Sequence, residues 1–259
     1  MLILLPPSET KTRPSEIGCP PLDLEVMTLP ALRSDRATML RAAQRTAATA
    51  DAAAHLKVPA SAPELVGRML HLDQEPAAPA LGVYSGVLFD QLDPASSPAP
   101  ERRVLVQSAL FGLVDAVQDR IPAYRLSAGS TVSRLGRAGS WWAPRLRPLA
   151  AALRETEAER GSPVVIDCRS GSYRSMMAMR SDGAVRVLEV SPVQERGGVR
   201  TVISHDAKRY RGLVTRALLA AADTPASADE VVDVVRDGLG AGLQIELEGD
   251  RLVVVDRAD

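Results

Sequence analysis

Basic residues follow a short apolar run near residue 203, in a segment whose composition favours a helix. Lys208, Arg211 and Thr215 are spaced i, i+3 and i+7, so a helix places them on one face. Cations in the first turns of a helix oppose its macrodipole, whereas an anion there is held by free backbone N–H groups. The pattern indicates an anion site clamped by Lys208 and Arg211. The alternative is that Asp206 and other carboxylates neutralise these side chains within the fold.

A second group of polar residues follows the Val-rich run from 103 to 107. Ser108 stands at the end of this predicted core strand, where ligands gather in sheet proteins. Tyr124 and Arg125 offer a ring face and a bidentate donor, which suit a base or a phosphate. The alternative places Tyr124 in the core and Arg125 in a surface ion pair. Tyr84, between two glycines, is a further candidate for the site, with a structural role as its alternative.

The sequence predicts neither a metal site nor a bound cofactor. The three histidines are scattered along the chain and lack the spacing of metal-ligand motifs. Gly-rich phosphate loops, dinucleotide fingerprints and the GxSxG elbow are also missing from the sequence. These observations argue against P-loop ATP hydrolysis, Rossmann cofactor use and α/β-hydrolase chemistry.

Apolar runs bounded by turn residues predict the elements that must position these groups. Strands are expected at 2–5, 103–107, 163–168, 185–190, 199–204, 243–248 and 251–256. Helices are expected at 34–56, 148–160, 206–222 and 228–239. The first strand meets Pro6-Pro7 and a polar loop that contains Ser8. Ser8 and Ser108 should therefore converge with Arg125, Lys208 and Arg211 at one edge of a sheet.

Length and composition limit the classes of protein to which the chain can belong. A chain of 259 residues is long enough for a substantial core and is expected to form one domain over 1–259. Two cysteines, Cys19 and Cys168, are too few for a disulfide framework and fit a reducing cytoplasm. The sequence shows no signal peptide and no apolar run of membrane-spanning length, so a cytoplasmic protein without a membrane partner is expected.

Charge is distributed unevenly along the chain. The net charge is −1, yet residues 101–222 carry 20 basic and 11 acidic side chains, whereas residues 223–259 carry 3 and 10. The middle segment is thus strongly basic, and the predicted C-terminal helix and hairpin over 223–259 are acidic. A polyanion could bind only to a localised basic face. The alternative is an arginine-rich surface balanced by ordinary acidic neighbours.

Motifs in a fixed order along nearly the whole chain resemble the YaaA peroxide-stress family. The matching pieces are Met1–Lys11, Gly82–Gly86, Gln107–Gly112, Pro122–Leu126, Trp142, Val164–Asp167 with Tyr173, and Ile203–Gly212. The resemblance implies a mixed α/β fold with a central sheet and flanking helices. It also implies a cytoplasmic role in limiting peroxide damage, linked to lowered free iron, and binding of duplex or branched DNA through a basic cleft with a helix-hairpin-helix element.

Four features depart from the family pattern, and one is that the Arg-Pro usual after the Ser108 motif is absent, with Asp115 and Ala116 nearby instead. An insertion displaces Lys11, and Ser172-Tyr173-Arg174-Ser175 replaces the more usual Glu-Tyr-Phe-Lys. The segment 48–75, where the helix-hairpin-helix is expected, is Ala-rich and lacks a glycine hairpin.

The leading prediction is a DNA-binding protein of the peroxide stress response that contacts phosphates with little sequence preference. The alternative is an enzyme that acts on a nucleotide or nucleobase in the same pocket, and a third reading is a partner protein without a small ligand. The residues expected to line the site are Ser8, Lys11, Tyr84, Ser108, Tyr124, Arg125, Tyr173, Lys208 and Arg211.

Overall fold

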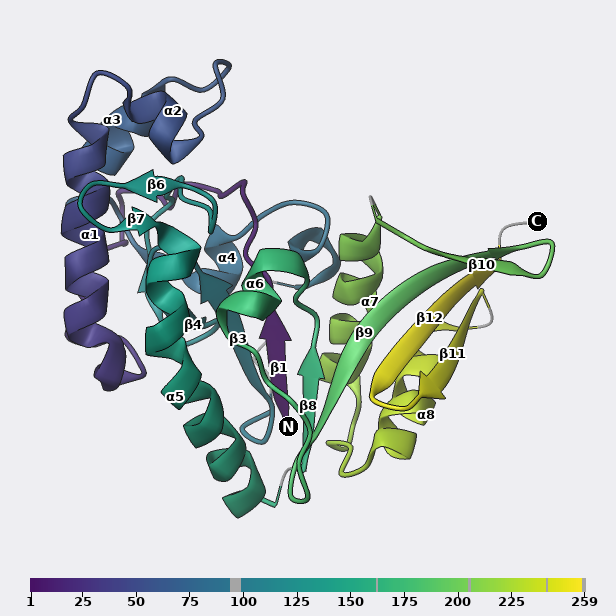
Figure 1. Cartoon of the computed structure of the whole chain (residues 1–259). Coiled ribbons are helices and arrows are strands. Elements are labelled where there is room, and N and C mark those ends of the chain that lie inside the picture. The colour runs from purple at the N-terminus through teal and green to yellow at the C-terminus, as the bar shows by residue number, and fades with distance from the viewer. Residues whose placement is uncertain (94–98, 162, 205, 241, 258–259) are drawn as a thin grey trace.

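The computed structural model describes residues 1–93, 99–161, 163–204, 206–240 and 242–257. It has a mixed parallel and antiparallel sheet flanked by helices, which confirms the expected α/β class (Figure 1). Within the described residues, no helix is long and apolar enough to cross a membrane.

One eight-stranded sheet organises the chain. Its order is β11-β12-β9-β8-β1-β3-β4, and β10 pairs with β9 outside this path. The strands are β1 (Leu2–Leu5), β3 (Arg103–Ser108), β4 (Gly112–Asp115), β8 (Val164–Asp167), β9 (Arg186–Arg196), β10 (Val199–Val202), β11 (Leu243–Glu248) and β12 (Arg251–Arg257). Strand β12 runs parallel to β9, so the acidic C-terminal hairpin belongs to the main sheet.

The central strand β1 fixes where the site can form. It lies between β3 and β8 and is parallel to both, with Leu5 opposite Val106 and Leu4 opposite Asp167. All of its side chains are fully buried, as a continuous apolar run between two parallel neighbours predicts. Parallel strands end at the same edge, so the loops after β1, β3 and β8 meet there.

Helices pack at both ends of the sheet. Figure 1 shows α1 (Arg33–Ala47) and α5 (Ala138–Glu159) beside β3 and β4, and α7 (Ala207–Ala220) and α8 (Ala228–Leu239) beside the C-terminal strands. Short helices, 3-10 turns and strand pairs complete the carboxyl edge and the segment around α1. They are α2 (Ala52–Leu56), α3 (Glu64–Leu70), α4 (Ala80–Val83), α6 (Gly171–Met176), η1 (Pro30–Leu32), η2 (Phe89–Gln91), β2 (Ala78–Pro79) with β5 (Arg120–Ile121), and β6 (Thr131–Val132) with β7 (Gly136–Arg137).

A buried arginine ties α1 to the strand edge. The Arg36 guanidinium donates to the carbonyl oxygens of Phe111 at 3.1 Å, Leu113 at 2.6 Å and Thr28 at 2.6 Å. Burial lowers the pKa of Arg36 to about 10, and Asp119 opposes part of that effect. These three hydrogen bonds satisfy the donors of a guanidinium that is fully buried.

The expected elements after residue 198 agree closely with the structure, whereas one expected strand and two expected helices differ from it. The strand predicted at 185–190 continues to Arg196 in β9, and β10 pairs with Val193–Arg196, beyond the predicted strand. The predicted helix at 34–56 is two helices, because α1 ends at Ala47 and α2 begins at Ala52. The predicted start at Pro148 is wrong, because α5 begins at Ala138 and holds both Pro144 and Pro148 inside it. The segment 48–75 contains α2 and α3, joined by residues 57–63, which include no glycine.

Two helical glycines give a matched test of this packing. A Cβ on Gly212 of α7 would collide with the Leu88 carbonyl oxygen and lie 2.8 Å from Gln91 Cγ, whereas a Cβ on Gly67 of α3 would meet nothing within 4 Å. We expect Gly212→Ala to lower the free energy of unfolding by about 1–3 kcal/mol through overpacking. Gly67→Ala should raise it by about 0.5–1 kcal/mol through helix propensity. Urea denaturation of both variants measures the difference, and equal effects would contradict the packing of α7 on η2.

Candidate functional site

The loop at residues 6–11 leaves the sheet at its carboxyl edge and passes beside the end of α4. Lys11 forms an isolated antiparallel bridge with Tyr84, and the Thr12 amide donates to the Val83 carbonyl at 2.9 Å. These contacts hold Lys11 and Tyr84 opposite each other, although they are far apart in sequence. We call residues 6–11 the β1 loop.

The Lys11 amine is held by aromatic rings and a backbone carbonyl. Nζ donates to the Ser8 carbonyl oxygen at 2.7 Å and lies 4.0 Å from the centroid of the Tyr124 ring and 5.3 Å from that of Tyr84. Aromatic faces attract a cation, but they stabilise it less than water and a carboxylate would. The side chain as a whole is half-buried.

The nearest acidic residue is bound by another cation. Arg125 Nη2 donates to Glu9 Oε2 at 2.9 Å, and its other nitrogens donate to the carbonyl oxygens of Glu9 and Lys57. Burial is the main cause that lowers the pKa of Lys11 to about 7; the nearby Arg125 charge lowers it further and Glu9 partly opposes this. Near neutral pH, a large fraction of the Lys11 amine is therefore uncharged.

Three hydroxyl groups form a buried chain below this amine. Ser108 Oγ lies 2.8 Å from the Tyr124 hydroxyl, which lies 2.9 Å from the Tyr84 hydroxyl. Ser108 Oγ also accepts from the amides of Leu110 and Phe111 at 3.2 and 2.9 Å. Burial raises the pKa of Tyr84 and of Tyr124 above the ordinary range, so both hydroxyls keep their protons.

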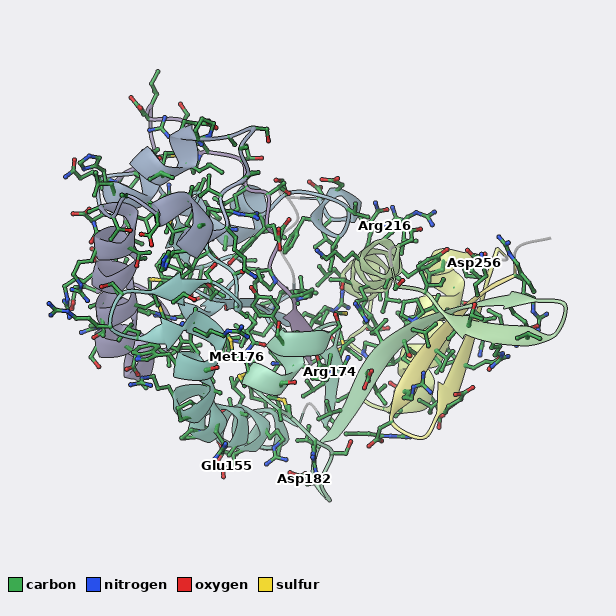
Figure 2. The ribbon with its side chains drawn as sticks, turned by 45° about the horizontal axis from the view of Figure 1, so that its top comes forward. Glu155, Arg174, Met176, Asp182, Arg216 and Asp256 are labelled. Atoms are coloured by element: carbon green, nitrogen blue, oxygen red, sulfur yellow. The ribbon has the colours of Figure 1, made fainter. Side chains whose placement is uncertain are left out.

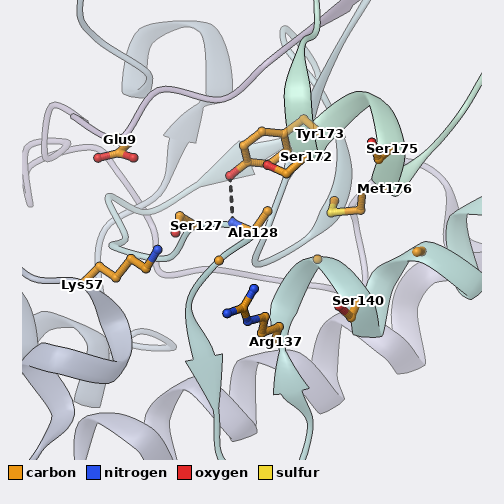
Figure 3. Close-up of a pocket in the computed structure, with 13 residues that line it drawn as sticks. Glu9, Lys57, Ser127, Ala128, Arg137, Ser140, Ser172, Tyr173, Ser175 and Met176 are labelled. Atoms are coloured by element: carbon orange, nitrogen blue, oxygen red, sulfur yellow. Dashed lines mark hydrogen bonds between the residues drawn. The ribbon is translucent and has the colours of Figure 1, made fainter.

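A hollow of about 480 Å³ opens on one side of the β1 loop (Figure 3). Lys57 from the end of α2 and Arg137 from β7 point into it, and Tyr173 borders it where its hydroxyl accepts from the Ala128 amide at 3.2 Å. Lys57 has a left-handed backbone, with φ 57°. The other lining residues are mostly small or hydroxylated: Glu9, Ser127, Ala128, Gly129, Gly139, Ser140, Ala143, Ser172, Ser175 and Met176. We call this the first hollow.

A second hollow of about 380 Å³ lies on the other side of the β1 loop. Lys208 from the first turn of α7 reaches it, and Ser8 and Glu9 line it from the loop. Gly86 closes it at a positive φ of 96°, where a Cβ would lie 2.9 Å from Thr10 Oγ1. Glu9 lines both hollows, so the β1 loop separates them.

Arg211 is placed differently from its helical neighbour Lys208. It is buried and donates to Ser170 Oγ at 3.2 Å, and burial lowers its pKa. Asp206 lies 3.6 Å from Arg209 and does not cap the helix through its side chain. Lys208 and Arg211 therefore do not form the expected pair of exposed side chains around one anion, since only Lys208 is exposed.

A buried ion pair supports the edge of β8. Arg169 binds both carboxylate oxygens of Asp167 at 2.9 Å and donates to Gln107 Oε1 at 2.7 Å. Arg174 of α6 pairs with Glu189 on β9. In Figure 2, Arg174 lies on the β9 side of α6, and Met176, which lines the first hollow, lies on the opposite side. Sequence reasoning did not identify these groups, and they hold α6 between the strands and the first hollow.

The structure gathers most of the expected site residues around the β1 loop. Lys11 contacts Tyr84 and Tyr124, whose hydroxyls connect to Ser108, and Arg125 binds Glu9. Ser8 and Lys208 line the second hollow, and Tyr173 lines the first. Arg211 lines neither of these hollows.

Sequence reasoning missed Lys57 and Arg137. One sequence signal could have found Lys57: of 31 basic residues, only three are lysines, and these are Lys11, Lys57 and Lys208. All three adjoin the β1 loop or a hollow that it lines. No comparable signal marks Arg137 among so many arginines.

Metal ligands do not gather in the described part of the chain. Across those residues, no group of three or more His, Cys, Asp and Glu side chains is arranged to hold a metal ion. The sequence-based prediction of a metal-free protein stays a prediction.

Comparisons with known proteins agree on one family. The family model described as peroxide stress protein YaaA matches residues 1–240. A UPF0246 protein of Corynebacterium efficiens is 36% identical over 259 residues, covering 97% of each chain. A second from Corynebacterium glutamicum is 35% identical over 95% of each chain, and a third from Streptomyces coelicolor is 34% identical over 96% of this chain and 93% of its own. The chain therefore belongs to the YaaA peroxide stress protein family.

Proposed function

We propose that this protein binds DNA through its phosphates at the two hollows beside the β1 loop. Its family is named for peroxide stress, which links the chain to the response to oxidative stress. One observation carries the proposal. Lys57, Arg137 and Lys208 are exposed at these hollows and, within the described residues, none has a carboxylate at ion-pair distance.

Unpaired cations at the rim of a hollow suit a phosphate backbone. Lys and Arg neutralise phosphates and release counterions, which gives affinity without base recognition. Arg125 is bound to Glu9, and Arg211 is buried, so neither is available for this contact. We therefore expect about three phosphate contacts and modest affinity, since the chain carries a net charge of −1.

The salt dependence of DNA binding tests this assignment. Each duplex phosphate contact contributes about 0.9 to the slope of log K against log salt, so three contacts give a slope of about −2.7. Replacing Lys57 and Arg137 together by Gln should flatten that slope by about two units. Fluorescence anisotropy with a labelled duplex, between low and moderate salt, measures the change.

Arg180 and Arg196 provide the matched control, because both are exposed and line neither hollow. Replacing both by Gln removes the same net charge and should leave the slope within half a unit. Equal flattening by the two double variants would show that binding follows net charge rather than these hollows. Absence of binding to duplex, single-stranded and branched DNA at low salt would end the proposal.

A nucleotide-acting enzyme is the second candidate, and the first hollow favours it. Its volume of about 480 Å³ falls in the usual range of small-molecule sites, about 300–1,000 Å³. It combines the cations Lys57 and Arg137 with the ring of Tyr173. A phosphate between the cations and a base near the ring would use both kinds of group.

Calorimetry with AMP and adenosine tests this candidate. If the cations hold the phosphate, AMP should bind at least about tenfold more tightly than adenosine, which corresponds to about 1.4 kcal/mol. Lys57→Gln should remove most of that advantage and leave adenosine binding unchanged. No detectable heat with any mononucleotide at millimolar concentration would count against the enzyme and leave the DNA proposal standing.

A further inference from the structure

The Lys11 amine has the surroundings of a nucleophile. Among the described residues it has no carboxylate at ion-pair distance, since Glu9 binds Arg125, and its contacts are two tyrosine rings and the Ser8 carbonyl oxygen. We propose that Lys11 forms an imine with the aldehyde of a phosphate-bearing ligand, and that Tyr84 delivers the proton that the carbonyl oxygen needs.

A desolvated lysine is a common nucleophile toward carbonyl carbon, because the neutral amine carries the reactive lone pair. Arginine cannot take this role at neutral pH, since its guanidinium stays protonated. The position opposite Tyr84 holds one of the three lysines of an arginine-rich chain. The lowered pKa of Lys11, about 7, agrees with the geometry.

The hydroxyl chain has a defined proton direction. Ser108 Oγ accepts from two backbone amides, which occupies both of its lone pairs, so its proton is directed to a tyrosine oxygen, and that of Tyr124 lies at 2.8 Å. The Tyr124 proton then goes to the Tyr84 oxygen. Tyr84 accepts from Tyr124 and also lies within hydrogen-bonding reach of Ser108, whose lone pairs are already occupied. We infer that the Tyr84 proton can pass to a ligand oxygen that approaches Lys11.

Formation of the imine at Lys11 requires neither an oxidant nor a reductant. The Lys11 lone pair attacks the aldehyde carbon, the C–N bond forms, and the carbonyl oxygen takes a proton from Tyr84. The nitrogen loses one proton, which restores the tyrosine, and gives a neutral carbinolamine. A further proton from solvent lets the C–O bond break, water leaves, and a protonated imine remains.

The unpaired cations indicate the rest of the ligand. Lys57 and Arg137 lie in the hollow on one side of the β1 loop and Lys208 lies in the hollow on the other. A phosphate held by either group would bring an attached aldehyde toward the loop that carries Lys11. This inference uses the same cations as the DNA proposal but does not require DNA binding.

Reductive trapping on the unaltered full chain tests the inference. The probe is glyceraldehyde 3-phosphate with cyanoborohydride, and peptide mass spectrometry then reports adducts on the three lysines separately. At pH 7 we expect Lys11 to be labelled at least about tenfold faster than Lys57 or Lys208. Glyceraldehyde, the same aldehyde without phosphate, should label Lys11 about tenfold more slowly. Equal labelling of the three lysines would overturn the inference. Equal rates with the two probes would show that the phosphate of the ligand does not contribute to the reaction at Lys11.

Two variants separate the roles of the amine and the hydroxyl. Tyr84→Phe keeps the ring beside Lys11 but removes the proton donor, so trapping at Lys11 should slow by about 100-fold, the usual range for acid–base groups. Lys11→Arg keeps a long basic side chain but removes the amine nucleophile, so the Lys11 adduct should be lost while Lys57 and Lys208 label as before. An unchanged Lys11 rate in Tyr84→Phe would exclude the hydroxyl from the step.

The pH dependence of the trapping rate distinguishes a reactive Lys11 from a lysine with only a structural role. The groups that face the amine are Arg125, Glu9, Tyr84 and Tyr124. Trapping at Lys11 should rise up to about pH 7 and then level off, because the amine is neutral above its pKa of about 7. A rate that climbs about tenfold per unit to pH 9 would show an ordinary amine. A protein that binds DNA yet leaves Lys11 unlabelled would overturn this inference and not the proposed function.

Discussion

Strand β1 is confined on both sides by parallel neighbours, and this constraint arranges the site. Its side chains are fully buried, and Pro6 and Pro7 follow directly, so the chain must turn out of the sheet where β3 and β8 also end. The β1 loop then lies beside the hydroxyl chain that starts at Ser108 of β3, and near α6 and the first turn of α7. A shift of β1 by one residue would move Lys11 away from Tyr84 and break the bridge that pairs them.

Two cations of the site, Lys11 and Arg125, lie near the single carboxylate of Glu9, and only Arg125 binds it. Glu9 is mostly exposed, yet it pairs with Arg125, whose fork also reaches the carbonyl oxygens of Glu9 and Lys57. A planar, multidentate guanidinium gains more from this arrangement than a single ammonium would. Lys11 is left to aromatic faces and a carbonyl oxygen, and its proton is weakly held.

The sequence predicted regular elements well where a local signal existed. Apolar runs around the glycine turn at 249 identified the hairpin of β11 and β12. The turn at 197–198 also indicated a hairpin, but β10 pairs with Val193–Arg196 of β9, beyond the predicted strand at 185–190. Helix α8 begins at Ala228 as predicted, directly after the Ser227 cap. Pro148 suggested a helix start, but α5 begins at Ala138 and contains both Pro144 and Pro148, because tertiary packing outweighs their local penalty.

The site was less predictable because distant segments supply it. Ser108 could be proposed from its place at a strand end, and Tyr124 from its neighbour Arg125. Lys57 and Arg137 instead reach the first hollow from the end of α2 and from β7, which carry no motif. The i, i+3 spacing placed Lys208 and Arg211 on one helical face, yet that face passes from solvent at Lys208 into the protein at Arg211. The spacing of two residues determines whether their side chains share a helical face, but the packing of that face determines whether each side chain is buried.

The β1 loop should keep the Lys11 amine uncharged and available near neutral pH, and NMR titration of this amine measures its protonation state. Selective labelling of lysine side chains gives three signals, and Lys11→Arg identifies the one from Lys11. We expect this signal to titrate with a pKa of about 7. A midpoint near the ordinary value of 10.5 would instead show that Lys11 is an ordinary surface cation and no nucleophile.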